Sequence, residues 1–221
     1  MIQAILFDLD GTLADTAPDL AGALNRQRTT RGLAPLPLEV LRPHASSGAR
    51  GLLGAGFGIT PGHDDYEAMR EEFLTFYEND IAIETSLFDG VPELLTVLET
   101  RSLAWGIVTN KIERFTHPLV SRIGLSPRAG CVVSGDTTPH AKPHPAPLLE
   151  AASRLGVQPA RCLYVGDDQR DILAARAAGM GAIAAAYGYL GVAVPPQDWG
   201  ADALIETPLA LLNLLPAHPS V

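Results

Sequence analysis

Residues 2–13 read IQAILFDLDGTL, a nearly continuous apolar run that stops at two acids, Asp8 and Asp10, one residue apart. Such a run is typical of a central strand in a parallel sheet, because both faces of that strand are buried under helices. Gly11 lets the backbone turn sharply directly after the acids. Open α/β sheets bind their ligands beyond the carboxyl ends of their strands. We therefore expect a ligand site here, although a strand that ends in a solvated polar turn gives the same local sequence.

The rest of the chain predicts an α/β fold interrupted by a helical insertion. Strand-like apolar segments recur at residues 104–110, 131–133, 162–168, 182–186 and 203–205. Helical patterns separate them, and this alternation indicates βαβ units and a parallel sheet. Between residues 15 and 85 the patterns are helical, without a convincing strand. We expect a Rossmann-like core domain made of residues 1–14 and 86–221, and a helical domain made of residues 15–85.

The composition limits the classes of partner. The chain has 221 residues, a formal net charge of −9 and 47% hydrophobic residues, which suffice for a sizeable core. The sequence has neither a basic stripe for nucleic acid nor the roughly 18 consecutive apolar residues of a membrane span. Because no basic leader precedes the first apolar run, we expect a cytoplasmic protein. We also expect a monomer or weak dimer that binds neither nucleic acid nor membrane. Cys131 and Cys162 lack metal-site or redox spacing and are predicted to be buried thiols.

Further polar side chains stand where later strands end. Thr109 and Asn110 close one predicted strand, Lys142 follows the next by a short loop, and Asp167 and Asp171 follow a third. Since the carboxyl ends of parallel strands meet at one edge of a sheet, these residues are expected to converge near the first two acids. Alone, each has an ordinary interpretation, such as a strand-end hydroxyl, a solvated lysine or an acid that offsets a helix dipole. Their repeated placement favours a shared site.

These motifs, in this order, resemble those of the haloacid dehalogenase superfamily of phosphohydrolases. The first is residues 8–13, DLDGTL, the second is Thr109, the third is Lys142, and the fourth is residues 166–171, GDDQRD. They span the predicted core from end to end, so the resemblance covers the whole chain. Across its full length the chain also looks like the phosphoglycolate phosphatase group, and it is especially similar to bacterial N-acetylmuramic acid 6-phosphate phosphatases.

The resemblance implies a phosphomonoesterase that acts on a small anionic ester through an aspartyl-phosphate. In this scheme Asp8 is the nucleophile, and Asp10 protonates the leaving alkoxide and then takes a proton from the attacking water. Thr109 and the backbone N–H of Asn110 hold the phosphoryl oxygens, and Lys142 neutralises charge on the nucleophile and the phosphate.

The resemblance also implies Mg²⁺, a cation that prefers oxygen ligands and keeps several waters. Its expected protein ligands are the Asp8 carboxylate, the backbone carbonyl of Asp10 and the Asp167 carboxylate. Asp171 is expected to orient a metal-bound water or Lys142 rather than to bind the metal directly.

The helical insertion stands where this superfamily carries a cap that closes over the active site. Within it, residues 46–50, SSGAR, are predicted to form a loop that binds substrate through Ser47, Gly48 and Arg50, since free N–H groups before a helix and an arginine suit an anion. An ordinary helix start with a surface arginine is the alternative. Two other functions stay open: a phosphomutase of the β-phosphoglucomutase type, and a phospho-aspartate switch without turnover, for which a lid has no use.

Overall fold

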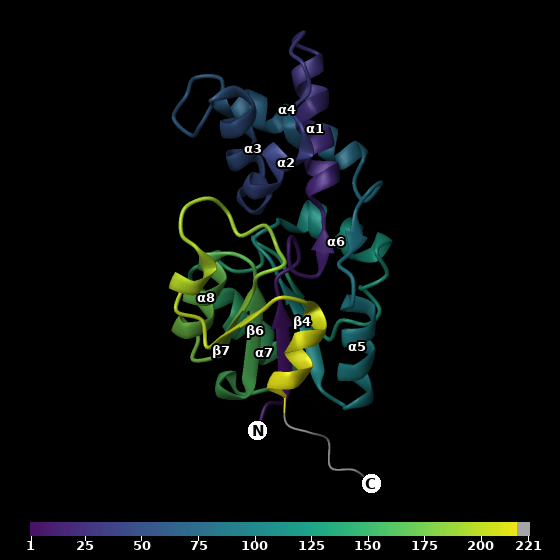
Figure 1. Cartoon of the computed structure of the whole chain (residues 1–221), viewed down its shortest axis with the longest axis vertical. Helices are drawn as coiled ribbons and strands as arrows, with labels where there is room; N and C mark the ends of the chain where they lie inside the picture. Colours follow the sequence, from purple (N-terminus) through teal and green to yellow (C-terminus); the bar gives the residue numbers. More distant parts are fainter. Residues whose placement is uncertain (216–221) are drawn as a thin grey trace.

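A parallel sheet with β1 near its centre organises the molecule (Figure 1). The computed structural model describes residues 1–215; the last six residues of the predicted core range, 216–221, lie outside the described residues. In this described part the sheet has six strands in the order β5-β4-β1-β6-β7-β8, and all neighbours are parallel. The strands are β1 Ala4–Phe7, β4 Ala104–Val108, β5 Val132–Val133, β6 Cys162–Gly166, β7 Gly181–Ala185 and β8 Ala203–Ile205. The predicted α/β class with a parallel sheet is confirmed.

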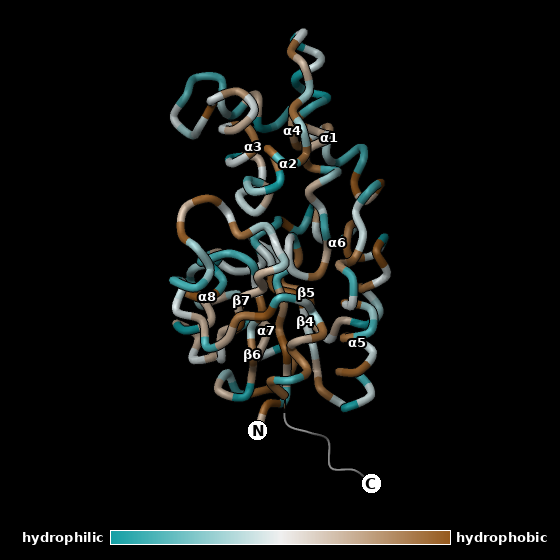
Figure 2. Tube along the Cα trace, in the orientation of Figure 1, coloured by the Kyte–Doolittle hydropathy of each residue, from teal (hydrophilic) through white to brown (hydrophobic). Residues whose placement is uncertain are grey.

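Strand β1 is buried on both faces, as its apolar sequence predicts. Its alternate residues enter two different hydrophobic clusters: Ile5 and Phe7 belong to one, Ala4 and Leu6 to the other. Helices α5 (Val91–Thr100) and α6 (Glu113–Arg122) pack on the first cluster, while α7 (Ala146–Leu155) and α8 (Gln169–Ala177) pack on the second. Hydrophobic residues follow the strands in Figure 2, and hydrophilic residues gather in the outer loops. Helices therefore cover both faces of the sheet.

Four helices gather at the end of the molecule beyond the carboxyl ends of the strands (Figure 1). They are α1 Ala17–Thr29, α2 Leu38–Leu41, α3 Gly48–Phe57 and α4 Tyr66–Asn79. The first hydrophobic cluster continues into them through Leu24, Leu52 and Phe73.

The 3-10 helices are η1 Arg42–Ser47, η2 Pro159–Arg161, η3 Pro196–Asp198 and η4 Pro208–Leu214. Among the described helices, none has both the length and the apolar character needed to cross a bilayer.

The structure corrects two local expectations. Strand β2 (Ala14–Asp15) pairs antiparallel with β3 (Ser86–Leu87), so Asp15 lies in a strand and not in a helical segment. Two-residue strands have no periodicity of their own. This pair forms because the segment that leaves the four helices runs beside the segment that enters them. Residues 46–50 do not form the predicted loop: residues 46–47 end η1, and residues 48–50 lie in the first turn of α3. Gly48, with a positive φ of 54°, allows the change from one helix to the next. The predicted burial of Cys131 and Cys162 is confirmed.

Candidate active site

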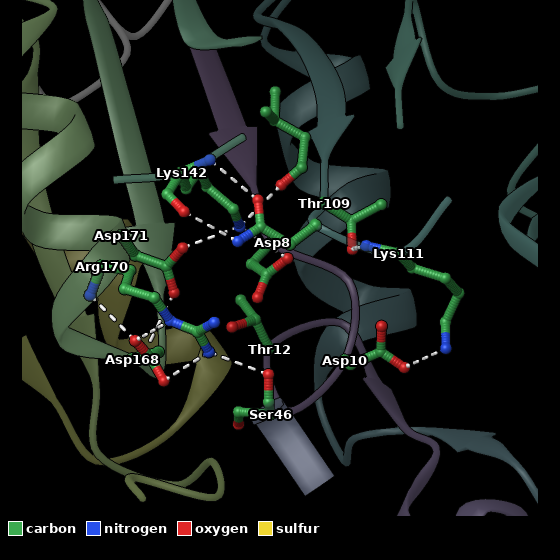
Figure 3. A network of polar contacts seen from close by, with 12 residues as sticks. Asp8, Asp10, Thr12, Ser46, Thr109, Lys111, Lys142, Asp168, Arg170 and Asp171 are labelled. Atoms are coloured by element: carbon green, nitrogen blue, oxygen red, sulfur yellow. Dashed lines mark hydrogen bonds and ion pairs between the residues drawn. The ribbon is translucent and has the colours of Figure 1, made fainter. Parts of the chain in front are cut away.

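The loops after β1, β4, β5 and β6 converge at one edge of the sheet (Figure 3). Asp8 directly follows β1, and its backbone N–H donates to the carbonyl of Val165 at 2.9 Å, which fixes the loop after β1 beside β6. Asp8, Asp167, Asp171 and Lys142 are all buried, with no more than 8% of each residue exposed. Four ionisable groups with so little access to water need one another or a bound ion.

Lys142 is the cation of this group. Its ammonium lies 2.9 Å from Oδ1 of Asp8 and 2.7 Å from Oδ1 of Asp171, and it donates to the Tyr164 hydroxyl at 2.7 Å. The Asn110 side chain holds the Lys142 backbone from both sides, donating to its carbonyl and accepting from its N–H, both at 2.9 Å. Although burial lowers the pKa of Lys142, Asp171 and Asp8 outweigh it and raise that pKa above its usual value.

Asp167 lies deepest and is held by hydrogen bonds. One oxygen accepts from the Thr12 hydroxyl at 3.0 Å, and the other accepts from the backbone N–H of Tyr189 at 2.9 Å. A Cβ on Gly11 or Gly188 would overlap the Asp167 side chain, so both glycines are required by this close approach. The position of Asp167 therefore depends on two segments that are far apart in the sequence, residues 11–12 and 188–189.

Three carboxylates form a cluster that fits a divalent cation. One oxygen from each of Asp8, Asp167 and Asp171 lies within 4.8 Å of the others. Burial raises the pKa of Asp8 to about 7; Lys142 opposes this, and Asp171 and Asp10 add to it. Burial and then the neighbouring Asp8 and Asp171 raise the pKa of Asp167 well above its usual range. One ammonium for three buried carboxylates leaves an excess of negative charge, and hard oxygen donors of this kind are what Mg²⁺ binds.

Asp10 has different neighbours from Asp8. Its Oδ1 lies 3.1 Å from the ammonium of Lys111 and accepts a hydrogen bond from the Thr16 hydroxyl at 2.5 Å. Lys111 also donates to the Tyr77 hydroxyl of α4 at 3.2 Å, and its backbone N–H donates to Thr109 Oγ1 at 3.1 Å. The Asp10 carboxylate thus faces Lys111, beside the Asp8 cluster rather than inside it (Figure 3).

Sequence reasoning missed Lys111 and Arg170. Arg170 pairs with both carboxylate oxygens of Asp168, at 2.7 and 2.9 Å, and donates to the carbonyl of Ser46 at 2.8 Å. The Ser46 hydroxyl lies 3.3 Å from Asp167, so this segment of η1 meets the core at two points. Arg170 lies within the fourth motif, residues 166–171, and Lys111 lies two residues after the second motif, Thr109. Their position was a usable signal.

A cavity of about 300 Å³ lies between the sheet edge and the helices. Its lining includes most residues that the sequence singled out, namely Asp8, Asp10, Ser47, Gly48, Arg50, Thr109, Asn110, Lys142 and Asp171. Asp167 is buried beside this lining, next to Asp8 and Asp171. The structure therefore brings residues from distant parts of the chain to one cavity, which combines these polar side chains with apolar ones such as Leu20 and Phe73.

The profile of the haloacid dehalogenase-like hydrolase family matches residues 5–185. The chain is 41% identical to an N-acetylmuramic acid 6-phosphate phosphatase of Pseudomonas aeruginosa, over 97% of this chain and 95% of the relative. It is 46% identical to a phosphoglycolate phosphatase of Xanthomonas campestris pv. campestris, over 93% of each. A crystal structure described as a predicted phosphoglycolate phosphatase from Haemophilus somnus superposes with a TM-score of 0.84 and 26% identity, covering 96% of this chain and 97% of that one.

These similarities confirm the resemblance inferred from the motifs and the prediction of a phosphatase-type enzyme. The match covers the strands that end just before Asp8, Thr109 and Asp167, as well as the helical insertion between the first two of these strands. The chain belongs to the haloacid dehalogenase-like hydrolase family.

Proposed function

We propose that this protein is a Mg²⁺-dependent phosphomonoesterase that hydrolyses a small anionic ester through an aspartyl-phosphate on Asp8. The observation that carries the proposal is the buried group of Asp8, Asp167 and Asp171 around Lys142, at the floor of a cavity large enough for a small molecule. A carboxylate held in place beside a fixed cation is suited to attack a phosphoryl group.

In the first step an Asp8 oxygen bonds to phosphorus while the bond from phosphorus to the leaving oxygen breaks. Lys142, 2.9 Å from Asp8, offsets negative charge on the nucleophile and the phosphoryl oxygens. Thr109 and the backbone N–H of Asn110, which follow β4 beside β1, hold those oxygens. The Asn110 side chain acts by fixing the Lys142 backbone.

Asp10 moves the protons. It gives one to the leaving alkoxide in the first step and takes one from the water that attacks the aspartyl-phosphate in the second, which frees Asp8 and inorganic phosphate. Its contacts with Lys111 and Thr16 support this role because they hold the carboxylate at the cavity, where a leaving group enters.

The residues that would hold Mg²⁺ are Asp8, the backbone carbonyl of Asp10, and Asp167. Bound there, the ion supplies positive charge that offsets charge on the phosphoryl oxygens. Asp171 keeps Lys142 in place, and its other oxygen accepts from the backbone N–H of Asp168 at 3.1 Å. Burial raises the pKa of Asp8 and of Asp167, so ionising both carboxylates is costly without a cation, which supports a divalent ion at this position.

We propose that residues 15–85 act as a cap on a core made of residues 1–14 and 86–221. Asp19 supports a hinge here, because its carboxylate accepts from the backbone N–H groups of Glu84 and Thr85 at 2.8 and 3.0 Å and so ties the two connecting segments together. Ser47, Gly48 and Arg50 are the proposed substrate contacts of the cap. Arg50→Ala is expected to raise KM for the physiological ester more than KM for p-nitrophenyl phosphate.

The candidate substrates are 2-phosphoglycolate and N-acetylmuramic acid 6-phosphate, because relatives named for both cover nearly the whole chain. A small-molecule substrate and a cytoplasmic location are part of the proposal. Phosphate release from a panel of esters, with Mg²⁺ and with an EDTA control, tests it. One ester with kcat/KM at least tenfold above the others, about 1.4 kcal/mol of discrimination, names the substrate. Isomerisation of a sugar phosphate would favour a mutase, and no turnover at all would favour the switch.

A further inference from the structure

One charged residue stands in the apolar face that α4 turns toward the cavity. Tyr66, Arg70, Phe73, Leu74 and Tyr77 recur at helical spacing and all line the cavity. Arg70 is half-buried, whereas the other charged residues of α4 do not line the cavity. A guanidinium placed among aromatic and aliphatic side chains loses part of its hydration, so it gains much from an anion that reaches it.

The two walls of the cavity differ in their charge balance. On the core wall every acid already has a cation within 3.1 Å, in the pairs Asp8–Lys142, Asp171–Lys142, Asp10–Lys111 and Asp168–Arg170. The helical wall contributes Arg50 and Arg70 and no acid. Throughout residues 1–215, no carboxylate forms an ion pair with either of these two arginines. The helical wall therefore presents positive charge that the described protein does not neutralise.

We propose that Arg70 is a specificity-determining residue that binds a second anionic group of the substrate, a carboxylate on the leaving-group side of the ester. The inference rests on the proposed function, in which Asp8 and Lys142 take the phosphoryl group at the core wall. A planar guanidinium matches a carboxylate with two parallel hydrogen bonds. Phe73, Leu74 and Tyr66 then supply an apolar wall for the carbon atoms between the two charged groups. The cavity is thereby selective for phosphate esters of hydroxy acids over phosphate esters whose leaving alcohol carries no charge.

A second phosphate group on the substrate could bind Arg70 in place of a carboxylate. The test therefore compares substrates that carry one or the other of these two anions. The substrate pair is 2-phosphoglycolate and its primary amide, which differ only in the charged group. Where N-acetylmuramic acid 6-phosphate is the better substrate, N-acetylglucosamine 6-phosphate is its partner without the carboxylate. Glucose 1,6-bisphosphate supplies the second phosphate. If Arg70→Met weakens only the bisphosphate, the carboxylate assignment is wrong.

The variants are Arg70→Met, Arg70→Lys and the control Arg161→Met, which changes an exposed arginine outside the cavity. We expect Arg70→Met to lower kcat/KM for the carboxylate ester about 30-fold, mainly through KM. The kcat/KM for the partner ester without the carboxylate should change less than threefold. For Arg70→Lys, kcat/KM for the carboxylate ester should lie between the values for Arg70→Met and the unmutated protein, because lysine keeps the charge without the planar geometry. Arg161→Met should leave both values unchanged. Equal losses on both esters, or none on either, would overturn the inference.

Binding without turnover separates failure of this inference from failure of the proposed function. In an Asp8→Asn background, calorimetry with the same ester pair measures affinity whether or not the protein is a hydrolase. Weaker binding of the carboxylate ester alone after Arg70→Met supports the inference, and unchanged binding of both esters rejects it. An unmutated protein that hydrolyses none of the esters rejects the proposed function whatever the binding data show.

Discussion

The Lys142 ammonium lies 2.9 Å from Oδ1 of Asp8, at the bottom of a cavity that both the sheet and the helical insertion enclose. It also lies 2.7 Å from Asp171, so one cation serves two carboxylates, and Asp167 stands beside them with hydrogen bonds alone. The ion pair with Lys142 fixes the position of the Asp8 carboxylate, but one ammonium does not balance three carboxylates. The remaining negative charge is what a divalent cation offsets.

The first prediction concerns stability against pH in metal-free protein. Burial raises the pKa of Asp8 from 3.8 to about 7. Because the folded state binds this proton more tightly than the unfolded state, protonation of Asp8 stabilises the fold. That stabilisation is present in full below about pH 4 and is lost as pH rises through 7. In EDTA we expect the free energy of unfolding to fall by about 1–3 kcal/mol between pH 5 and pH 8. Urea denaturation at fixed ionic strength measures it.

Asp8→Asn is the matched variant for that experiment, because it removes the titrating group and keeps the shape. Its free energy of unfolding should fall less steeply between pH 5 and pH 8. Added Mg²⁺ should restore stability at pH 8 in the unmutated protein, since a ligand that binds only the folded state stabilises it. Parallel pH profiles for the two proteins would remove Asp8 as the source of the effect.

The second prediction concerns the glycine that lies against Asp167. A Cβ at position 188 would overlap both the Asp167 side chain and the backbone of Gly11. Gly188→Ala is therefore expected to displace Asp167, to weaken Mg²⁺ activation at least tenfold and to destabilise the fold by about 1–3 kcal/mol. Titration of phosphate release against Mg²⁺ measures the first effect, and thermal unfolding measures the second.

Gly22→Ala is its control, because a Cβ there meets nothing within 4 Å and the position is an exposed one in α1. Alanine in a helix is about 0.5–1 kcal/mol more favourable than glycine, so this variant should be as stable or slightly more stable, with unchanged Mg²⁺ dependence. A Gly188→Ala protein with normal Mg²⁺ activation would show that Asp167 tolerates displacement.

Lys111 supplies the third prediction, since it holds Asp10 on one side and Tyr77 of α4 on the other. Lys111→Met should lower kcat/KM for an alkyl phosphate by about 10–100-fold, because Asp10 loses the group that orients it as a general acid. The value for p-nitrophenyl phosphate should change less than about threefold, because its leaving group needs little protonation. Steady-state kinetics with both esters measures the contrast.

The control for Lys111 is Tyr77→Phe, which removes the hydroxyl contact with α4 and keeps the ammonium beside Asp10. It should affect the two esters alike. If Lys111→Met also lowers kcat/KM equally for both, the lysine does not act through the leaving group and its role is structural.

The sequence was informative where burial dictates residue type. Continuous apolar runs located the sheet strands, and the predicted segment 203–205 coincides with β8. The polar residues that end these runs met at one edge because parallel strands share a direction. Asp8 and Thr109 could be found this way, since each stands at a change from apolar to polar sequence, and Lys142 through its place in the loop after the next strand.

The rest depends on contacts between distant segments. The place of Arg170 within residues 166–171 marks it as a candidate, but its contact with Ser46 depends on the docking of η1 on the core, which leaves no local pattern. Arg70 interrupts an apolar helical face, but the direction of that face was unknown until α4 was placed over the sheet edge. The pairing of β2 with β3 is too short to show periodicity.

Phosphate release by Asp8→Asn, beside the unmutated protein at the same Mg²⁺ concentration, tests the central claim most directly. Asparagine keeps the shape of the side chain but is too weak a nucleophile to form an acyl-phosphate. We expect kcat/KM for the preferred ester to fall by at least about 10³-fold, with a circular dichroism spectrum and a melting transition that still show a folded protein. Turnover within tenfold of the unmutated protein would contradict the assignment of Asp8 and the aspartyl-phosphate route with it.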